Sequence, residues 1–355
     1  MGVPKMSLKK DYLERAFSIM SEKSSLYQSS SFWEEACRKI SNNVNNNGLE
    51  NFRSEISNLH FFVPTYGFPG NSFSKEDIKK TLSLFHEDAS KKNYLSLEKY
   101  LNGEILATSD YKIFKSSNDR NDKLDLLDFS ESSFGNPIEQ FSIEDNNYSR
   151  SSLNYLLGLS FLKSILPDFV PKTVLEIGGG FGTLGEILHQ VPKHDIKYID
   201  IDLPPIFLIA SEYIRNACSL RENDYKLSEL NDDIETINID ELPRFSFLPS
   251  WEIERLNGKI DLFVNFISFQ EMEPDIVKNY LEIVSSLDTE VILLRNMKEG
   301  KQKASKDRVG VISPVTGSDY ADFLPDFDQI GSNILPFGYT TVDNFNSELL
   351  VFKRK

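Results

Sequence analysis

Short apolar segments alternate with amphipathic ones from about residue 146 to the end of the chain. The apolar segments TVLEIGGG, KYIDID, RFSFLP, KIDLFVNFI and EVILLRN have the length of strands, and TLGEILHQV, PPIFLIASEYIRNAC and PDIVKNYLEIVSSL have helical periodicity. Strands that alternate with helices pair in parallel and form a doubly wound sheet with helices on both faces. We therefore predict an α/β fold with a mostly parallel sheet.

The end of the chain departs from this alternation. GYTTVDNF and ELLVFKR have the pattern of two strands around a short turn. Strands joined by a tight turn are antiparallel, so we expect a C-terminal hairpin that adds an antiparallel strand to the sheet.

Residues 1–145 have a different character. They are polar, rich in Ser and Asn, and carry helical periodicity in short pieces such as DYLERAFSIM. Asn favours turns over helix interiors, so we expect the run SNNVNNN to end the second helix as a solvated linker. We predict a mainly helical cap and substrate-recognition region over 1–145, and a domain that holds the α/β sheet over 146–355.

The net charge of the chain limits its partners. Across 355 residues, 39 Lys and Arg face 54 Asp and Glu, which gives a net charge of −15. A chain this acidic repels phosphate backbones, so we expect no nucleic-acid partner. No run of about 18 apolar residues predicts a membrane span, and the N-terminal segment lacks the pattern of a signal peptide, so we expect a cytoplasmic protein. The oligomeric state stays open.

The stretch VLEIGGGFGTLGEIL is the most informative motif. An apolar strand leads into the run Gly178, Gly179, Gly180, Phe181, Gly182, and an apolar helix face follows. Glycines permit a sharp turn and the close approach of a ligand, and the helix start offers unpaired N–H groups. The stretch 180–185 also satisfies G-x-G-x-x-G, so the glycines alone are compatible with a nicotinamide dinucleotide such as NAD.

Acidic residues beside this motif favour a different cofactor. Glu176 lies near the end of the apolar strand, where a carboxylate is costly unless it has a role. It would repel a pyrophosphate, whereas S-adenosylmethionine carries an ammonium and a sulfonium. We therefore favour S-adenosylmethionine, with an NAD-dependent oxidoreductase as the alternative. Asp202, with Asp200 in reserve, ends the next strand, where an acid can bind the ribose hydroxyls of either cofactor.

These residues carry a resemblance to a known family. VLEIGGGFG with KYIDIDLPP resembles the class I S-adenosylmethionine-dependent methyltransferases, which have a Rossmann-like fold. The strings SSLNYLLGLSFLK, DLFVNFISFQEME, LLRNMKEGKQK and PFGYTTVDNFNSELLVF resemble a family of sugar O-methyltransferases from bacterial surface-polysaccharide loci. That resemblance runs from about Gly135 to the C-terminus. It implies methyl transfer to a sugar hydroxyl, in a polysaccharide, another glycan or a nucleotide-sugar.

The resemblance also implies roles for particular residues. The glycines at 178, 180 and 182 would line the methionine part of the cofactor, Glu176 would support it, and Asp202 would bind the ribose. Leu248 and Trp251 would border the adenine, and Asn265 and Phe266 would lie past the adenine and methionine regions.

The chemistry of methyl transfer suggests where the acceptor binds. The hydroxyl oxygen must lie about 3 Å from the methyl group, and a general base would activate it. In the segment ISFQEMEPD we predict Glu271 as the base, with Ser268 and Gln270 as substrate contacts. Among the histidines, His60 near Tyr66 is the better placed to reach the substrate if the helical region folds over the site.

A metal ion is not expected. Two cysteines in no metal-like spacing and four histidines cannot assemble a zinc cluster. Catechol-type O-methyltransferases hold magnesium with aspartates after their fourth and fifth strands, whereas Arg295 stands at the second of these positions in this chain and would repel the ion.

The same arginine and a basic loop suggest a substrate clamp. The loop MKEGKQKASKDR has a local net charge of +3. We predict that Arg295, Lys301 and Lys303 bind a phosphate or carboxylate of the substrate; a solvated loop is the alternative. A non-catalytic α/β protein that keeps the cofactor pocket is a further alternative to the enzyme.

Overall fold

The computed structural model describes residues 8–62, 75–84, 91–231, 233, 235–304, 310–341 and 344–355. Across these residues one mixed sheet forms the centre of the molecule, in the order β11-β13-β10-β9-β3-β4-β7-β5, with β12 beside β13. Its strands are β3 (Thr173–Ile177), β4 (Lys197–Asp202), β5 (Tyr225–Leu227), β7 (Phe245–Pro249), β9 (Leu262–Phe266), β10 (Val291–Met297), β11 (Phe327–Asn333), β12 (Tyr339–Thr340) and β13 (Asn346–Arg354).

The sheet confirms the predicted fold class. From β5 to β10 every neighbouring pair is parallel. β13 lies antiparallel between β10 and β11, as expected for a C-terminal strand. Its long partner was not predicted, because β11 has the mostly exposed and polar sequence FDQIGSN. Of the predicted strand GYTTVDNF, only Tyr339–Thr340 pairs with β13 among the described residues.

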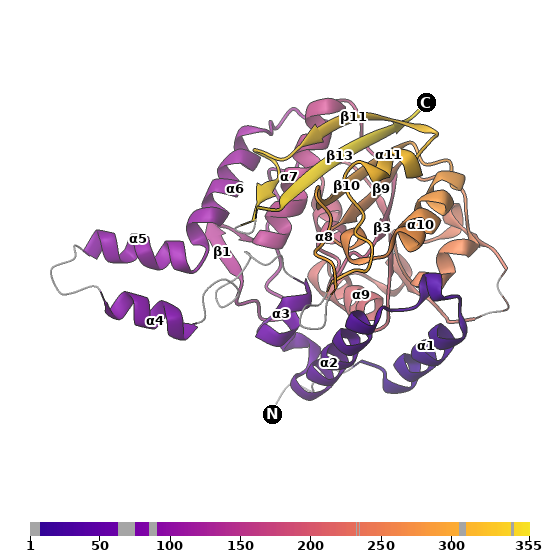
Figure 1. The fold of residues 1–355 in the computed structure, drawn as a ribbon, viewed down its shortest axis with the longest axis horizontal. Helices are drawn as coiled ribbons and strands as arrows, with labels where there is room; N and C mark the ends of the chain where they lie inside the picture. Colours follow the sequence, from indigo (N-terminus) through magenta and orange to yellow (C-terminus); the bar gives the residue numbers. More distant parts are fainter. Residues whose placement is uncertain are drawn as a thin grey trace.

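Helices cover both faces of the sheet (Figure 1). Phe266 of β9 stacks on Tyr155 of α7, with ring centroids 4.7 Å apart. Phe263 points to the opposite face, where it packs on Phe269, and Phe269 in turn packs on Tyr280 of α10. The helices of this part are α7 (Arg150–Ile165), α8 (Thr183–Gln190), α9 (Ile206–Ala217), α10 (Pro274–Ser286) and α11 (Asp319–Phe323).

The N-terminal part is mainly helical. It contains α1 (Lys10–Glu22), α2 (Ser31–Asn47), α3 (Ile56–Phe62), α4 (Lys75–Ser83), α5 (Lys91–Leu101), α6 (Glu104–Ser116) and a hairpin of β1 (Gln140–Ile143) and β2 (Asn146–Ser149). The expectation that SNNVNNN ends the second helix was wrong. α2 continues through the run because Val44 extends the buried face of Ile40 by one turn, and the helix ends at Gly48, whose φ is 86°.

Short elements complete the structure. The 3₁₀ helices are η1 (Ser25–Tyr27), η2 (Leu49–Asn51), η3 (Glu222–Asp224), η4 (Ile239–Glu241), η5 (Ser250–Arg255) and η6 (Phe269–Glu271), and β6 (Ile237–Asn238) pairs with β8 (Leu256–Asn257) apart from the main sheet. Among the described residues, no helix combines the length and the apolar character that crossing a membrane requires.

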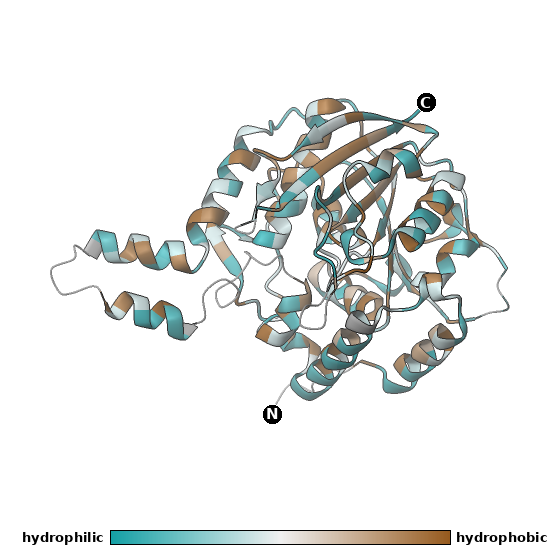
Figure 2. Ribbon diagram, viewed as in Figure 1, coloured by the Kyte–Doolittle hydropathy of each residue, from teal (hydrophilic) through white to brown (hydrophobic). Residues whose placement is uncertain are grey.

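One hydrophobic core joins the two parts of the chain. It runs from Leu8 to Phe352 and includes buried residues of α1, α2 and α6 together with the sheet. Figure 2 shows the apolar strands inside and the more polar helix faces outside. Arg53, fully buried, adds a polar link, because it donates to Glu139 at 2.7 Å, Glu131 at 2.9 Å and the Tyr213 hydroxyl of α9 at 3.2 Å.

Candidate functional site

The glycine loop connects β3 to α8 at the carboxyl edge of the sheet. Gly178, Gly180 and Gly182 have φ values of 73°, 62° and 92°, a region that favours glycine. The Gly178 N–H donates to the Ile201 carbonyl at 2.9 Å, which fixes the loop to β4. A Cβ at Gly178 would lie 2.2 Å from Ser268 Oγ, whereas at Gly180 the nearest atom, Phe62 Cδ1, would be 3.6 Å away. Among the residues that the structure describes, the loop is therefore tightly packed at its start and least crowded at Gly180.

A cluster of carboxyl groups lies directly under this loop. Glu176 is fully buried and accepts hydrogen bonds from Tyr155 at 2.7 Å and from Tyr198 at 2.5 Å. Its neighbour Asp200 is also fully buried, and neither of its oxygens has a hydrogen-bond partner of ordinary geometry. A Cβ at Gly179 would be 2.5 Å from Asp200 Oδ1 and 2.8 Å from Glu176 Oε2. Both carboxyl groups therefore lie against the loop backbone.

Burial governs the protonation of this cluster. It raises the pKa of Glu176 to about 7, although the hydroxyls of Tyr198 and Tyr155 lower it. Burial also raises the pKa of Asp200 well above its usual range, and the carboxylates of Asp202 and Glu176 raise it further. The charged side chains that act on these two groups are all carboxylates. In the absence of a positive charge, burial and mutual repulsion therefore favour the neutral forms of these carboxyl groups.

Asp202, at the tip of β4, connects the cluster to the loop. Its Oδ2 accepts the Gly180 N–H at 3.2 Å, and its Oδ1 accepts the Leu203 N–H at 2.7 Å. Burial raises its pKa to about 7. Burial raises the pKa of the Cys37 thiol of α2, and the carboxylate of Asp202 raises it further. The thiol of Cys37 therefore lies near Asp202. The N-terminal helices thus reach the site.

The predicted adenine and loop contacts are all buried, but in different surroundings. Leu248 of β7 pairs in register with Ile201, beside the tip of β4, and is 1% exposed; Trp251 is 3% exposed. Phe181 is buried and packs on the N-terminal side against Phe52 at 5.7 Å, with the Arg53 guanidinium 4.8 Å from its ring centre. In this structure Phe181 therefore links the loop to the N-terminal helices.

The end of β9 is held by side-chain amides. Asn265 donates to the Ile177 carbonyl at 2.9 Å and to Ser268 Oγ at 2.6 Å, which joins the tips of β9 and β3. Gln270 accepts the Met297 N–H at 2.8 Å. Ile267 has a φ of 74°, which is a strained conformation for a β-branched residue. The backbone is therefore strained at the turn that follows β9, where Ser268 lies against Gly178 of the glycine loop.

Glu271 lies just beyond this turn between two partners. Its Oε1 pairs with Lys301 from the segment after β10, and its Oε2 accepts the Trp33 Nε1–H of α2 at 3.1 Å. Sequence analysis did not identify Trp33, because it stands among the apolar residues of an ordinary amphipathic helix. The arrangement brings two segments, one from α2 and one after β10, to this carboxylate.

The remaining predicted substrate residues are more scattered. Arg295 is fully buried and donates to the carbonyls of Asn154 at 3.0 Å and Phe337 at 2.8 Å, with its guanidinium 5.2 Å from the centre of the Phe266 ring. His60 and Lys303 are exposed. Tyr66 lies outside the described residues. Among those described, no group of three or more His, Cys, Asp or Glu could hold a metal ion.

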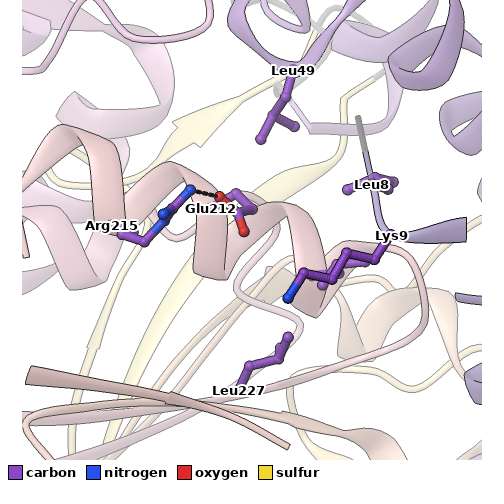
Figure 3. Close-up of a pocket in the computed structure, with 7 residues that line it drawn as sticks. Leu8, Lys9, Leu49, Glu212, Arg215 and Leu227 are labelled. Atoms are coloured by element: carbon purple, nitrogen blue, oxygen red, sulfur yellow. Dashed lines mark hydrogen bonds and ion pairs between the residues drawn. The ribbon is translucent and has the colours of Figure 1, made fainter. Parts of the chain in front are cut away.

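A separate cavity of about 200 Å³ lies between the start of α1 and α9 (Figure 3). Its lining consists of Leu8, Lys9, Leu49, Leu208, Glu212, Arg215 and Leu227. Figure 3 shows the ion pair between Glu212 and Arg215 at its edge. None of the predicted site residues lines it.

Solved structures with a similar fold are methyltransferases. Magnesium protoporphyrin IX methyltransferase from Synechocystis PCC 6803, with bound SAM, shares 12% identity over 57% of this chain and 81% of its own, with a TM-score of 0.37. An S-adenosylmethionine-dependent methyltransferase from Clostridium acetobutylicum ATCC 824 shares 16% identity over 56% of this chain and 92% of its own, with a TM-score of 0.37. The mitomycin 7-O-methyltransferase MmcR shares 12% identity over 93% of this chain and 70% of its own, with a TM-score of 0.36.

Sequence comparison adds no relative. No protein-family model and no curated protein matches the chain. At these identities and TM-scores, the likeness to solved structures carries no inference about ligand or activity. Any inference about function therefore rests on the residues of the site.

Proposed function

We propose that this chain transfers a methyl group from S-adenosylmethionine to a hydroxyl group of a sugar, in a glycan or a nucleotide-sugar. The observation that carries the proposal is the cluster of Glu176, Asp200 and Asp202 beneath and beside the glycine loop. The charged side chains that raise the pKa values in this cluster are all carboxylates. A cationic ligand offsets the cost of burying them, whereas the diphosphate of NAD would add to it.

The residues at the loop fit this cofactor. Among the described residues only Phe62 approaches Gly180, and each oxygen of Asp202 accepts one backbone N–H and keeps a further lone pair for a ribose hydroxyl. We assign Gly178, Gly180 and Gly182 to the methionine part, Asp202 to the ribose, and Asp200 and Glu176 to the electrostatic support of the positive charge. When bound, the cofactor supplies a methyl group activated by a sulfonium.

Hydrophobic residues and amides complete the proposed cofactor site. We assign Leu248 and Trp251 to the border of the adenine, and Asn265 and Phe266 to the segment that passes the adenine and methionine regions. All four side chains are buried, so in this structure they hold the shape of the carboxyl edge. For Phe181 and Gly179 we propose a supporting role, because Phe181 packs on Phe52 and Gly179 covers Asp200 and Glu176.

Glu271 is our candidate general base. It lies between Lys301 and Trp33 just beyond the glycine loop, and a carboxylate there can take a proton from a hydroxyl group. We propose that Ser268 contacts the acceptor, that Gln270 positions this segment, and that Lys301 and Lys303 attract a phosphate or carboxylate on the acceptor. The sugar itself rests on the resemblance of the sequence from about Gly135 onward to sugar O-methyltransferases.

The test is the release of S-adenosylhomocysteine. The protein is incubated with S-adenosylmethionine and, in separate reactions, with pools of nucleotide-sugars and of bacterial glycans. We expect release that depends on one of these pools and is lost in Glu271→Gln. Binding of the cofactor without release in any pool would instead favour the non-catalytic alternative. Release with a different class of acceptor would overturn the assignment to sugars and leave the methyltransferase assignment standing.

A further inference from the structure

The loop that follows β10 is tied down at its base. We call its described residues the β10 loop, with an outgoing segment, 298–304, and a returning segment, 310–317. The Gly317 N–H donates to the Lys298 carbonyl at 2.8 Å, which joins the two ends of the loop. A Cβ on Gly300 of the outgoing segment would lie 2.7 Å from the nearest atom of the returning segment. The base of the β10 loop is therefore closely packed.

The outer half of the β10 loop is mostly exposed. Gln302 and Ala304 are exposed, and the side chain of Ile312 is 77% exposed. Val311 is buried, its N–H donates to the Gln302 carbonyl at 3.2 Å, and its own carbonyl accepts the Ala304 N–H at 2.9 Å. These two bonds join the returning segment to the outgoing segment on either side of Lys303. Because this half has little apolar contact, its position depends on its polar contacts.

Glu273 supplies two of these polar contacts. Its Oε1 accepts the Ile312 N–H at 2.8 Å, and its Oε2 accepts the Ser313 N–H at 2.9 Å. Glu273 is also the N-cap of α10, but among the described residues its side chain makes no capping hydrogen bond to that helix. The carboxylate thus binds the β10 loop rather than its own helix. Hydrogen bonds to an ionised acceptor are stronger than those between neutral groups, so Glu273 is an effective anchor for the returning segment.

A second acid from the same short stretch holds the outgoing segment. Lys301 pairs with Glu271, which lies two residues before Glu273. The two acids differ in what happens to them during the proposed reaction. As the general base, Glu271 loses its charge when it accepts the proton of the acceptor hydroxyl, and its attraction for Lys301 weakens at that moment. Glu273 takes no part in that proton transfer and keeps both of its hydrogen bonds.

We propose, on the basis of the proposed function, that Glu273 is a positioning residue for the acceptor. It anchors the β10 loop through the returning segment, and the bonds of Val311 carry this constraint to Lys301 and Lys303. The two lysines therefore stay in place for a phosphate or carboxylate of the acceptor while Glu271 is protonated. A residue that served only the start of α10 would affect the stability of that helix and leave the acceptor alone.

The first test needs no substrate. Amide hydrogen exchange of the full-length protein, followed by mass spectrometry of fragments that contain Ile312 and Ser313, reports on the anchor directly. Glu273→Ala should speed the exchange of these two amides by about tenfold or more. Glu273→Asp keeps both oxygens on a shorter side chain and should give an intermediate rate. Glu282→Ala, which changes an exposed acid further along α10, should exchange like the wild type.

The second test is steady-state kinetics with the acceptor. Glu273→Ala should raise the KM for the acceptor by about tenfold and leave the dissociation constant of S-adenosylmethionine unchanged. Glu273→Asp should restore part of the loss. In the background of Lys301→Ala with Lys303→Ala, Glu273→Ala should raise the KM no further, because Glu273 acts through these two lysines.

The outcomes separate the anchor from the reaction. Wild-type exchange at Ile312 and Ser313 in Glu273→Ala would overturn the anchor. Faster exchange with an unchanged acceptor KM, a further rise of KM in the double-lysine background, or weaker cofactor binding would overturn the positioning role. A wild type that binds the cofactor and transfers no methyl group would overturn the proposed function and the acceptor role with it, while the exchange experiment would still decide on the anchor.

Discussion

Trp33 Nε1 donates a hydrogen bond to Glu271 Oε2 at 3.1 Å, although the two residues are 238 positions apart in the sequence. The indole also packs on Phe61, with ring centroids 6.1 Å apart. Because Lys301 pairs with the other oxygen of Glu271, the carboxylate is held from both sides. The N-terminal helices thus take part in positioning the proposed base.

This contact leads to a first prediction. Trp33→Phe keeps an aromatic ring against Phe61 and removes the donor to Glu271. Hydrogen bonds to charged groups contribute roughly 1.5–3 kcal/mol, so we expect kcat to fall by about tenfold or more while the affinity for S-adenosylmethionine stays unchanged. Steady-state kinetics of Trp33→Phe, Glu271→Gln and the double variant provide the measurement. Full additivity of the two effects would mean that the residues act independently.

The second prediction concerns the acceptor. Lys301→Ala with Lys303→Ala removes the ion-pair partner of Glu271 and a second, exposed lysine of the same segment, and leaves the glycine loop untouched. We expect a higher KM for the acceptor and an unchanged dissociation constant for the cofactor. The effect should shrink as ionic strength rises, because exposed charges are screened. Unchanged kinetics would show that the loop is only solvated. Lys278→Ala, on the outer face of α10, is the control.

The third prediction follows from the burial of Glu176. Its pKa rises from 4.5 to about 7 in the folded protein, so the folded state holds the proton more tightly than the unfolded state. The free energy of unfolding should therefore fall between pH 4.5 and 7, by about 3 kcal/mol from this group, and change no further above that range. Denaturant unfolding of the wild type and of Glu176→Gln at several pH values measures it. A difference between them that does not vary with pH would contradict the account.

The fourth prediction concerns the link between the two parts of the chain. Arg53→Met leaves Glu131 and Glu139 buried without their guanidinium partner, and we expect a loss of about 3–5 kcal/mol in unfolding free energy. Arg120→Met is the control: its ion pair with Asp128 is exposed, so its loss should stay within about 0.5 kcal/mol. If Arg53→Met does not fold, Arg53→Lys, which keeps the charge, should fold with intermediate stability. Equal stability of Arg53→Met and the wild type would contradict this.

The sequence was sufficient for features that depend on local pattern. The strands around the glycine loop are apolar runs, and Asp202 follows one of them directly, so their place at the carboxyl edge followed from the parallel topology. Glu176 stood out because a carboxylate in such a run is unusual. The structure adds its two tyrosine partners, of which Tyr155 comes from α7 and could not be inferred from spacing.

Features that depend on distant contacts were not predictable in this way. β11 is polar and becomes a strand only because β13 offers it an edge. α2 continues through an Asn-rich run because Val44 finds a place in the core. Trp33 and Arg53 have ordinary local surroundings in the sequence, and their partners lie 238 and 78–160 positions away. Only the folded chain brings these groups together.

The most direct test of the central claim is a calorimetric titration with S-adenosylmethionine, S-adenosylhomocysteine and NAD. We predict that the first two bind and that NAD does not. Asp200→Asn should weaken S-adenosylmethionine more than S-adenosylhomocysteine, which lacks the sulfonium charge. Asp261→Asn, which alters a carboxylate at the opposite edge of the sheet that accepts the Lys172 and Thr173 N–H groups, should affect neither. Binding of NAD, with no binding of either sulfur compound, would contradict the account.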